Sequence, residues 1–373
     1  NLFIVMALCE ETIYQIALTR IKGMNLLLAK TLLDTIGSAS EIFKEKGQNL
    51  QNICKLQTPV FSDESIKTAL ETAKREIDFI EKNHIIPLFF SDSEYPARLN
   101  ECIDAPILLY YRGTANLNAS KIISIVGTRH ATNYGRDFCK TLLQELSRWF
   151  PDLIIVSGLA YGIDICAHRE ALNNKLQTIG ILAHGMNTLY PATHRKTAAE
   201  MLSCGGLLTE YSSQHPTHKG NFVARNRIVA GMSDATLIIE SAEKGGSLIT
   251  AGIAESYHRD VFALPGNIQN EYSKGCNQLI RNNRAALVTS ARDIADAMCW
   301  DIPDKEPKQI SLFPELNETE TLLMEILEEK GECHINQLTI IGNLPASQVL
   351  ATLLELEFKG LVRPYPGGLY RKS

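Results

Sequence analysis

Short runs of apolar, β-prone residues between positions 121 and 290 constrain the fold of this chain more than any other feature. They are Ile122–Val126, Leu153–Val156, Gln177–Leu182, Gly206–Thr209, Ala235–Ile239, Val261–Ala263 and Ala286–Val288, and stretches of helical period separate them. The runs are apolar throughout instead of alternating, as expected of strands covered on both faces. Repeated strand–helix units of this kind predict an α/β fold with a Rossmann-like, doubly wound, mainly parallel sheet.

The rest of the 373 residues divides around this block. Residues 6–80 predict a helical module, because Gly23 interrupts two segments of helical spacing as in a helix-hairpin-helix or SAM-like unit, although any small helical module has the same outline. Residues 81–300 then form the Rossmann-like domain, and the proline-punctuated residues 301–316 form a linker. Residues 317–373 predict three helices and a β-hairpin, which is a winged helix. Met6 is a candidate natural start.

The bulk composition predicts a soluble, cytoplasmic globular protein. No apolar run approaches the roughly 20 residues that span a bilayer, and the apolar residues 2–8 lack the basic flank of a signal peptide. The nine cysteines include no Cys-x-x-Cys pair, so neither a zinc site nor a disulfide framework is expected.

The charge distribution is more informative than the net charge of −5. Residues 121–299 hold 18 Lys and Arg against 15 Asp and Glu, although the chain as a whole is acidic. The segment between Tyr211 and Ser233 contains Lys219, Arg225 and Arg227 and no acidic residue. A local basic segment on an acidic protein is compatible with phosphate binding that is confined to one groove.

Candidate binding residues follow the predicted strands, where an open α/β sheet binds its ligands beside helix N-termini. The segments are Gly127-Thr128-Arg129, Ser157-Gly158, His194-Arg195-Lys196, Lys219 with Phe222 and Arg225-Asn226-Arg227, and Gly245-Gly246-Ser247 with Thr250. Arginine offers a bidentate fork to phosphate, and glycine lets the backbone approach a ligand. The His194–Lys196 segment is equally compatible with a solvated helix start.

Two features of the fourth segment leave alternatives open. Phe222 can stack on a base, as aromatic rings commonly do in single-strand binding, but it can equally belong to the core. Arg225 and Arg227 lie on different faces of the expected helix, so we expect one of them to order the fold and the other to meet the ligand.

No complete catalytic constellation is present, and neither a cofactor nor a metal is expected. Asp164 and His168 share a helix face at i and i+4, which would suit a metal or an acid–base pair, but no third ligand or nucleophile accompanies them and a structural contact explains them equally well. The loop Lys244–Ser247 is neither a Walker A loop nor Gly-x-Gly-x-x-Gly, so it indicates neither ATP nor a dinucleotide.

Taken together and in this order, the segments resemble the DprA/Smf (DNA processing A) family. The matching residues are Tyr95-Pro96 with Leu99, Ile125–Arg129, Tyr134-Gly135, Ser157–Ala160 with Gly162–Asp164, Ala167-His168, Gly185, Tyr190-Pro191, Thr209–Tyr211, Phe222, Arg225–Arg227, Glu240, Gly245–Ser247 with Thr250-Ala251, and Pro265-Gly266. The resemblance is very specific over about residues 90–290 and looser at both ends.

The resemblance implies a homodimeric, non-enzymatic protein that binds single-stranded DNA, protects incoming DNA and helps load the RecA recombinase in natural transformation. It implies phosphate contacts at Arg129 and residues 194–196, and backbone amides from Ser157, Gly158 and Gly245–Ser247. His194 departs from the family, which usually has asparagine there. The alternative is a lysine-decarboxylase-like phosphoribohydrolase, but its Pro-Gly-Gly-x-Gly-Thr motif is not present.

Two features of the C-terminal region, the third helix of the winged helix and a segment of the linker, predict contacts with protein. The third helix of the winged helix carries Glu355 and Glu357 and no cation before Lys359, so we expect it to repel phosphates. The tail should contact protein, or pack on the main body, more than it contacts DNA. The linker segment Gln309–Phe313 resembles the short motif by which bacterial proteins dock on the replication sliding clamp. Leu312 and Phe313 could equally pin the linker to a domain.

Overall fold

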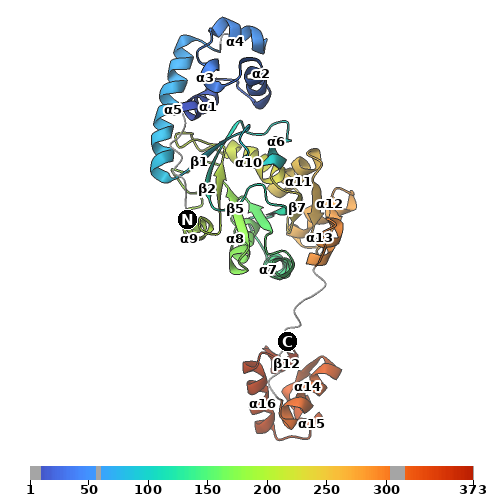
Figure 1. Ribbon diagram of the computed structural model, residues 1–373. Coiled ribbons are helices and arrows are strands. Elements are labelled where there is room, and N and C mark those ends of the chain that lie inside the picture. The colour runs from blue at the N-terminus through green and yellow to red at the C-terminus, as the bar shows by residue number, and fades with distance from the viewer. Residues whose placement is uncertain (1–9, 56–59, 303–315, 373) are drawn as a thin grey trace. The chain divides into compact units, whose positions relative to one another are not determined.

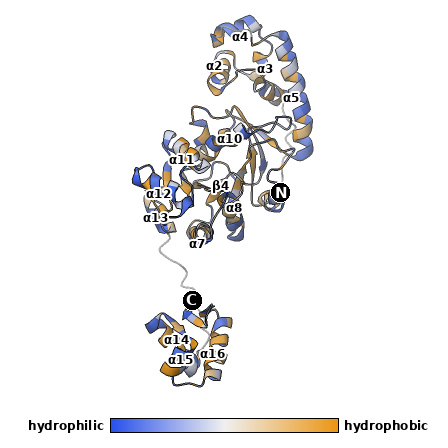
Figure 2. Cartoon of the chain, turned by 180° about the vertical axis from the view of Figure 1, so that it is seen from behind, coloured by the Kyte–Doolittle hydropathy of each residue, from blue (hydrophilic) through white to orange (hydrophobic). Residues whose placement is uncertain are grey.

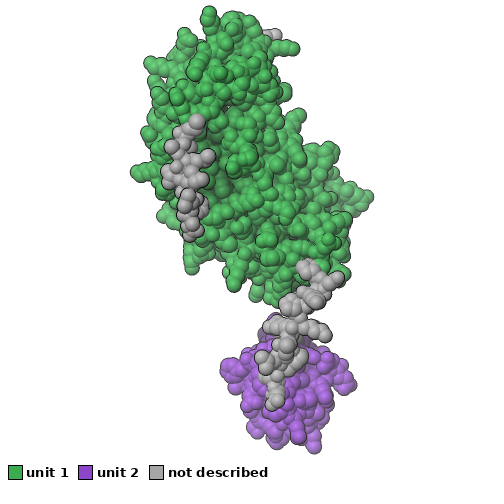
Figure 3. Space-filling model, viewed as in Figure 1, with its two compact units in different colours: residues 1–302 green, residues 303–373 purple. Residues whose placement is uncertain are grey.

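The computed structural model describes residues 10–55, 60–302 and 316–372, and Figure 1 labels their helices and strands. The chain separates into two compact units, residues 1–302 and residues 303–373, which Figure 3 shows in different colours. The candidate start at Met6 and the clamp-like segment Gln309–Phe313 lie outside the described residues.

A nine-stranded sheet forms the centre of the first unit, in the order β1-β2-β6-β5-β4-β3-β7-β8-β9. The strands are β1 Ile86–Phe89, β2 Leu108–Gly113, β3 Ile122–Val126, β4 Ile154–Ser157, β5 Gln177–Ile181, β6 Gly205–Thr209, β7 Ala235–Ile238, β8 Asp260–Ala263 and β9 Ala286–Leu287. From β6 to β9 the neighbouring strands pair in parallel, and β1 and β2 add an antiparallel edge. The predicted mainly parallel, doubly wound sheet is confirmed.

Helices cover both faces of this sheet because its strands are apolar on both sides. Ile122 and Val126 face one core cluster, whereas Ile123 and Ile125 face another. The helices of this region are α6 Ala97–Asn100, α7 Asn133–Trp149, α8 Ile163–Asn173, η1 Ala192–His194, α9 Arg195–Met201, α10 Lys219–Gly231, α11 Gly246–Ser256, η2 Glu271–Ser273, α12 Lys274–Arg281 and α13 Ala291–Ala297. Figure 2 shows apolar residues along the strands and hydrophilic residues on the outer sides of these helices.

The N-terminal helices share a core with the sheet. They are α1 Glu10–Leu18, α2 Leu26–Ile36, α3 Ala39–Ile42, α4 Gly47–Cys54 and α5 Asp63–Asn83. The predicted glycine turn lies between α1 and α2, where Gly23 has a positive φ of 81° that glycine adopts readily. Buried side chains of these helices belong to the same cluster as those of β1 and β2. The module is therefore packed against the sheet and does not hang from it on a free linker.

A buried carboxylate of α5 joins the N-terminal helices to the loop that follows β6. Glu76 of α5 is 2% exposed. Its Oε1 accepts a hydrogen bond from the Ser213 backbone N–H at 2.9 Å, and its Oε2 accepts one from the Ser213 hydroxyl at 2.6 Å. Ser213 lies in the loop between β6 and α10, so α5 fixes the chain that leads to the start of α10.

We expect the substitution Glu76→Ala to lower the free energy of unfolding by about 2–3 kcal/mol, because it leaves two buried donors of Ser213 without an acceptor. Glu76→Gln is the matched control: its amide oxygen still accepts one bond, so we expect a smaller loss. Urea titrations of the two variants beside wild type measure both values. Equal losses in both variants would contradict this account of the contact.

The second unit is a winged helix, as predicted. It consists of α14 Glu318–Lys330, β10 Glu332–His334, α15 Ile335–Ile341, α16 Ala346–Phe358, β11 Val362–Tyr365 and β12 Leu369–Lys372, and its strands pair in the order β10-β12-β11. Leu323, Leu338, Val349 and Leu353 lie in a core of its own. Across both units, none of the helices described is long and apolar enough to cross a membrane.

Candidate functional site

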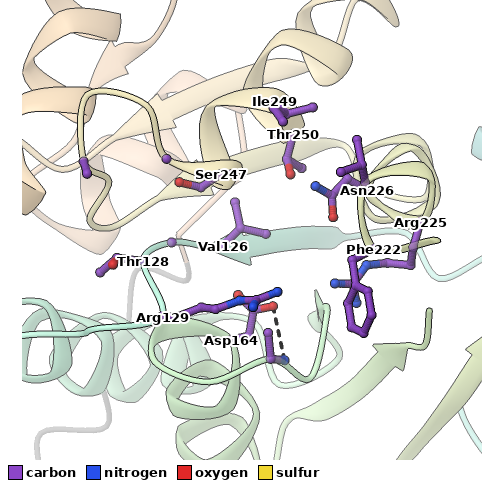
Figure 4. Close-up of a pocket in the computed structure, with 16 residues that line it drawn as sticks. Val126, Thr128, Arg129, Asp164, Phe222, Arg225, Asn226, Ser247, Ile249 and Thr250 are labelled. Carbon is purple, nitrogen blue, oxygen red and sulfur yellow. Dashed lines mark hydrogen bonds between the residues drawn. The ribbon is translucent and has the colours of Figure 1, made fainter. Parts of the chain in front are cut away.

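A pocket of about 280 Å³ lies at the carboxyl ends of the neighbouring strands β3 and β7, and Figure 4 shows the side chains around it. Its lining residues are Val126, Gly127, Thr128, Arg129, Ala160, Asp164, Phe222, Val223, Arg225, Asn226, Ala242, Gly245, Gly246, Ser247, Ile249 and Thr250. Ligand pockets commonly measure about 300–1,000 Å³. This pocket is therefore at the small end and suits one flat group better than a large molecule.

The loop after β3 is fixed by the end of β7. The Thr128 backbone N–H donates to the Glu240 carbonyl oxygen at 2.7 Å. The buried Glu240 carboxylate accepts from the backbone N–H and the hydroxyl of Thr132, at 2.8 and 2.5 Å. Gly127 has no room for a side chain, because a Cβ there would lie 2.6 Å from Ile163. These contacts hold Arg129 in place at the mouth of the pocket.

Arg129 and Phe222 face each other across the pocket (Figure 4). The guanidinium carbon of Arg129 lies 5.9 Å from the centre of the Phe222 ring, within the range of a cation–π contact. Arg129 is exposed and forms no ion pair with any carboxylate among the described residues. A free guanidinium beside a half-buried ring offers a phosphate contact and a stacking surface at the same place.

The opposite wall is the start of helix α11. Gly245 caps this helix with extended backbone and supplies no side-chain hydrogen bond to it. The first amides of a helix have no partner within the helix and attract anions. An added Cβ at Gly245 would lie 2.2 Å from the Ser241 hydroxyl oxygen, so a side chain does not fit there. Gly246 and Ser247 thus present backbone amides to the pocket, beside the buried Thr250. The predicted Gly245 amide is occupied, because it donates to the Ala242 carbonyl oxygen at 3.0 Å.

Arg225 lines the pocket but is 4% exposed and serves the fold. Its Nη1 donates to the carbonyl oxygens of Gly158 and Ile181, which end β4 and β5. Burial lowers the pKa of Arg225, and the Coulombic attraction of Asp164 opposes that shift. Arg225 therefore ties α10 to two strand ends.

Arg227 is also paired within the protein, because its Nη2 donates to the Glu210 carboxylate. The expected division, in which one of the two arginines meets the ligand, is not what the structure shows: both side chains have protein partners. Of the Arg-Asn-Arg segment, Arg225 and Asn226 line the pocket and Arg227 does not. Of the two arginines that line the pocket, Arg129 is the exposed one.

Other predicted residues support the pocket from outside its lining. The Ser157 hydroxyl is buried and donates to the Ile125 carbonyl oxygen at 2.6 Å. The Gly158 backbone N–H donates to Asp164 Oδ2 at 3.2 Å, so that amide is occupied. His194 is 4% exposed, and its Nδ1 lies 2.9 Å from the Leu159 carbonyl oxygen. The predicted phosphate contacts of these residues stay untested, and their burial favours a supporting role.

The remaining predicted cations lie on the surface. Arg195 and Lys196 begin α9, and Lys219 begins α10; all three are exposed and none of them lines the pocket. The structure thus brings together Gly127, Thr128, Arg129, Phe222, Arg225, Asn226, Gly245, Gly246, Ser247 and Thr250 from the predicted set.

Asp164 and His168 do not act on each other. Asp164 accepts from the backbone N–H groups of Gly158 and Ala160. His168 Nδ1 lies 2.7 Å from the Thr178 hydroxyl, which itself donates to the Ile155 carbonyl oxygen, so Nδ1 carries the proton. Nowhere in the described ranges do three or more His, Cys, Asp or Glu side chains gather as a metal site would require. The structural interpretation of this pair therefore agrees with the observed contacts.

The buried His168 predicts a pH-dependent stability. Burial, with the Coulombic effects of the neighbouring Arg225 and His194 side chains, lowers the pKa of His168 from 6.5 to about 3. As the pH falls below 6.5, His168 therefore binds a proton in the unfolded chain but stays neutral in the folded chain. The contribution of His168 to the free energy of unfolding is fully present above pH 6.5 and is lost as the pH falls toward 3. We expect the free energy of unfolding to fall by about 2 kcal/mol from pH 7 to pH 5 through this group.

The control for this expectation is His168→Gln, which removes the titrating ring and can still donate to Thr178. Urea unfolding of wild type and of this variant at both pH values isolates the contribution of His168. The same pH dependence in the two proteins would refute the assignment.

Sequence reasoning missed Tyr190 as a residue of this region. Its ring lies 5.6 Å from the Phe222 ring, centre to centre, in an edge-to-face arrangement. Tyr190-Pro191 is one of the segments that carry the family resemblance, and that was the available signal. It also treated Asp164 only as a partner of His168, whereas the structure places Asp164 in the pocket wall.

Comparisons with known proteins give matches in both units. A family described as DNA recombination-mediator protein A matches residues 87–299, and the DprA winged helix domain matches residues 308–368. Protein Smf of Escherichia coli is 35% identical over 301 residues, which are 78% of this chain and 77% of that protein. DNA processing protein DprA of Streptococcus pneumoniae is 38% identical over 203 residues, or 54% of this chain and 71% of that protein.

Two solved structures with similar folds are structures of proteins called DNA processing protein A (DprA). The X-ray structure of DprA from Streptococcus pneumoniae matches with a TM-score of 0.65 and 30% identity, covering 76% of this chain and 97% of that one. A second structure is that of DNA processing protein A from Helicobacter pylori, which is described as giving insight into the single-stranded DNA binding mode of that protein. It matches with a TM-score of 0.52 and 30% identity. It covers 58% of this chain and 97% of that one.

Proposed function

This chain belongs to the DNA recombination-mediator protein A (DprA/Smf) family, and from that premise we propose that it binds single-stranded DNA in the pocket between β3 and β7. The observation that carries the proposal is the pairing of the free cation Arg129 with the Phe222 ring across a small pocket. Single-strand sites combine cations for the backbone with aromatic rings for the bases. The relative from Helicobacter pylori is a single-stranded-DNA-binding protein.

We assign a role to each part of the pocket. Arg129 contacts one phosphate, and the amides of Gly246 and Ser247 contact another at the start of α11. Phe222 stacks on a base. Arg195, Lys196 and Lys219 attract the strand outside the pocket. Arg225 and Arg227 support the site through their protein partners, as Ser157, Gly158 and His194 do.

The wider role that we propose is DNA processing in the cytoplasm during natural transformation. In that role the protein protects incoming single strands and helps load RecA as a homodimer. The unpaired edge of β9, where Leu287 is 51% exposed, is a surface that a second copy can cover. We propose a binding protein and no enzyme; no observation favours the phosphoribohydrolase alternative, and release of base from nucleoside monophosphates would overturn that choice.

A titration with fluorescent oligonucleotides tests the function. We expect the full chain to bind a single-stranded oligothymidylate more tightly than a duplex of the same length, because a stacking site needs unpaired bases. Preferential duplex binding would contradict the proposal.

Deletion of residues 303–373 tests the division of labour between the two units. Because α16 carries Glu355 and Glu357 and the pocket lies wholly in the first unit, we expect the single-strand affinity to change less than threefold, roughly 0.6 kcal/mol. A loss of most of the affinity would place the main DNA contact on the winged helix instead.

A further inference from the structure

Two tyrosines beside the pocket expose their rings to solvent. Tyr161 is 42% exposed and Tyr190 is 51% exposed. The hydroxyls of Tyr95 and Tyr111, by contrast, are buried and donate to backbone carbonyl oxygens. Neither exposed tyrosine forms such a side-chain bond to any described residue. Their rings therefore do not serve the core in the way that the buried tyrosines do.

Tyr190 extends the aromatic surface of the pocket. Its ring contacts Phe222, which lines the pocket and faces Arg129. The Tyr190 backbone N–H donates to Nε2 of His184 at 3.1 Å, and His184 is 1% exposed. The ring is thus presented from an anchored backbone. The aromatic surface therefore continues from Phe222 to Tyr190.

Tyr161 lies on the loop after β4, directly after the pocket residue Ala160. Its ring lies 5.1 Å from the His194 ring in an edge-to-face arrangement. Because the Leu159 carbonyl oxygen can only accept, His194 Nδ1 donates to it, and the buried imidazole is fixed on the same loop. The buried His194 ring therefore supports the Tyr161 ring through this edge-to-face contact.

The charge around these rings suits a polyanion. Residues 171–199, which include the whole loop after β5, contain no Asp or Glu. Arg195 and Lys196 are exposed at the end of that loop. Exposed aromatic rings and exposed cations thus occur together in segments that lack acidic residues. This composition is typical of sites that bind single-stranded nucleic acids.

We propose that Phe222, Tyr190 and Tyr161 form an aromatic track on which successive bases of one strand stack. The track extends the site from β3 toward the ends of β4 and β5, and the phosphates of the strand lie against Arg195 and Lys196. This inference rests on the proposed function, and it adds where the strand goes when it leaves the pocket.

The experiment measures the affinity for thymidine 5′-monophosphate and for oligothymidylates of increasing length, with the full chain. Stacking of a base on an aromatic ring contributes about 1–3 kcal/mol by truncation. Tyr190→Leu and Tyr161→Leu should each weaken binding of the long oligonucleotides by about 5-fold to 150-fold. Binding of thymidine 5′-monophosphate, whose single base occupies the pocket alone, should stay within twofold.

Three controls accompany these variants. Tyr190→Phe and Tyr161→Phe keep the ring and should bind like wild type. Tyr134→Leu removes a third exposed tyrosine, whose hydroxyl bonds to the Pro265 carbonyl oxygen on the β8 side of the sheet, and it should leave the affinity unchanged. Thermal melts check that each variant is folded.

The outcomes separate the track from the proposed function. If wild type binds oligonucleotides of every length and the leucine variants bind equally well, the track is wrong and the proposed function stands. A loss in the phenylalanine variants as large as in the leucine variants, or an equal loss in Tyr134→Leu, also overturns it. If wild type binds no single strand at all, the proposed function fails first and the track fails with it.

Discussion

Replacement of Arg225 by alanine should lower the free energy of unfolding of the first unit by about 3–5 kcal/mol. The guanidinium is 4% exposed and satisfies the carbonyl oxygens of Gly158 and Ile181. The substitution leaves both acceptors buried without a donor, removes one of the two positive charges near Asp164, and opens a cavity. Urea unfolding followed by circular dichroism measures the change.

The matched control is Arg284→Ala. Arg284 also donates two hydrogen bonds, to Glu255, but the two side chains are 43% and 46% exposed. Exposed ion pairs contribute about 0–1 kcal/mol, so this variant should be nearly as stable as wild type. If the two arginine variants lose similar stability, Arg225 does not have the structural role that we assign to it.

Arg129→Ala should have the opposite profile: a stable protein with weak DNA binding. The side chain is exposed and forms no ion pair with any described carboxylate, so its removal should change the free energy of unfolding by less than about 0.5 kcal/mol. A charge-assisted hydrogen bond contributes about 1.5–3 kcal/mol, which predicts a loss of single-strand affinity of roughly 10-fold to 150-fold. The salt slope of binding should fall in magnitude by about 0.7 for one lost phosphate contact.

Arg148→Ala is the control for this measurement. Arg148 is an exposed arginine in the last turn of α7, a helix that begins at the pocket loop, so it lies at the far end of the sheet. Its removal changes the net charge by the same amount and should leave the affinity and the salt slope nearly unchanged. A similar loss in both variants would mean that binding follows total charge and not the pocket.

The sheet was predictable from the sequence because its strands are buried on both faces. Runs such as Ile122–Val126 and Ala235–Ile239 carry apolar residues at both alternating sets of positions, as strands covered on both faces require. The order of strands beyond their parallel pairing was not predictable from these runs. The close packing of α5 on the sheet edge was missed as well, since Glu76 and Ser213 lie 137 residues apart.

The candidate pocket was predictable in outline and not in detail. Strand ends that carry glycine and arginine indicated where a ligand binds, and Arg129, Phe222 and Gly245–Ser247 do meet there. The sequence could not divide the arginines, because the partners of Arg225 lie 67 and 44 residues away along the chain. The same reason applies to His194, whose buried partner Leu159 is 35 residues away.

The central claim is that single-stranded DNA lies in the pocket between β3 and β7. Photochemical crosslinking of the full chain to an oligothymidylate that contains a photoreactive thymine tests it directly, because mass spectrometry of the digest identifies the peptide next to the base. We predict crosslinks to the peptide of α10 that contains Phe222, competed away by unlabelled single strand. Crosslinks confined to residues 317–372 would contradict the account.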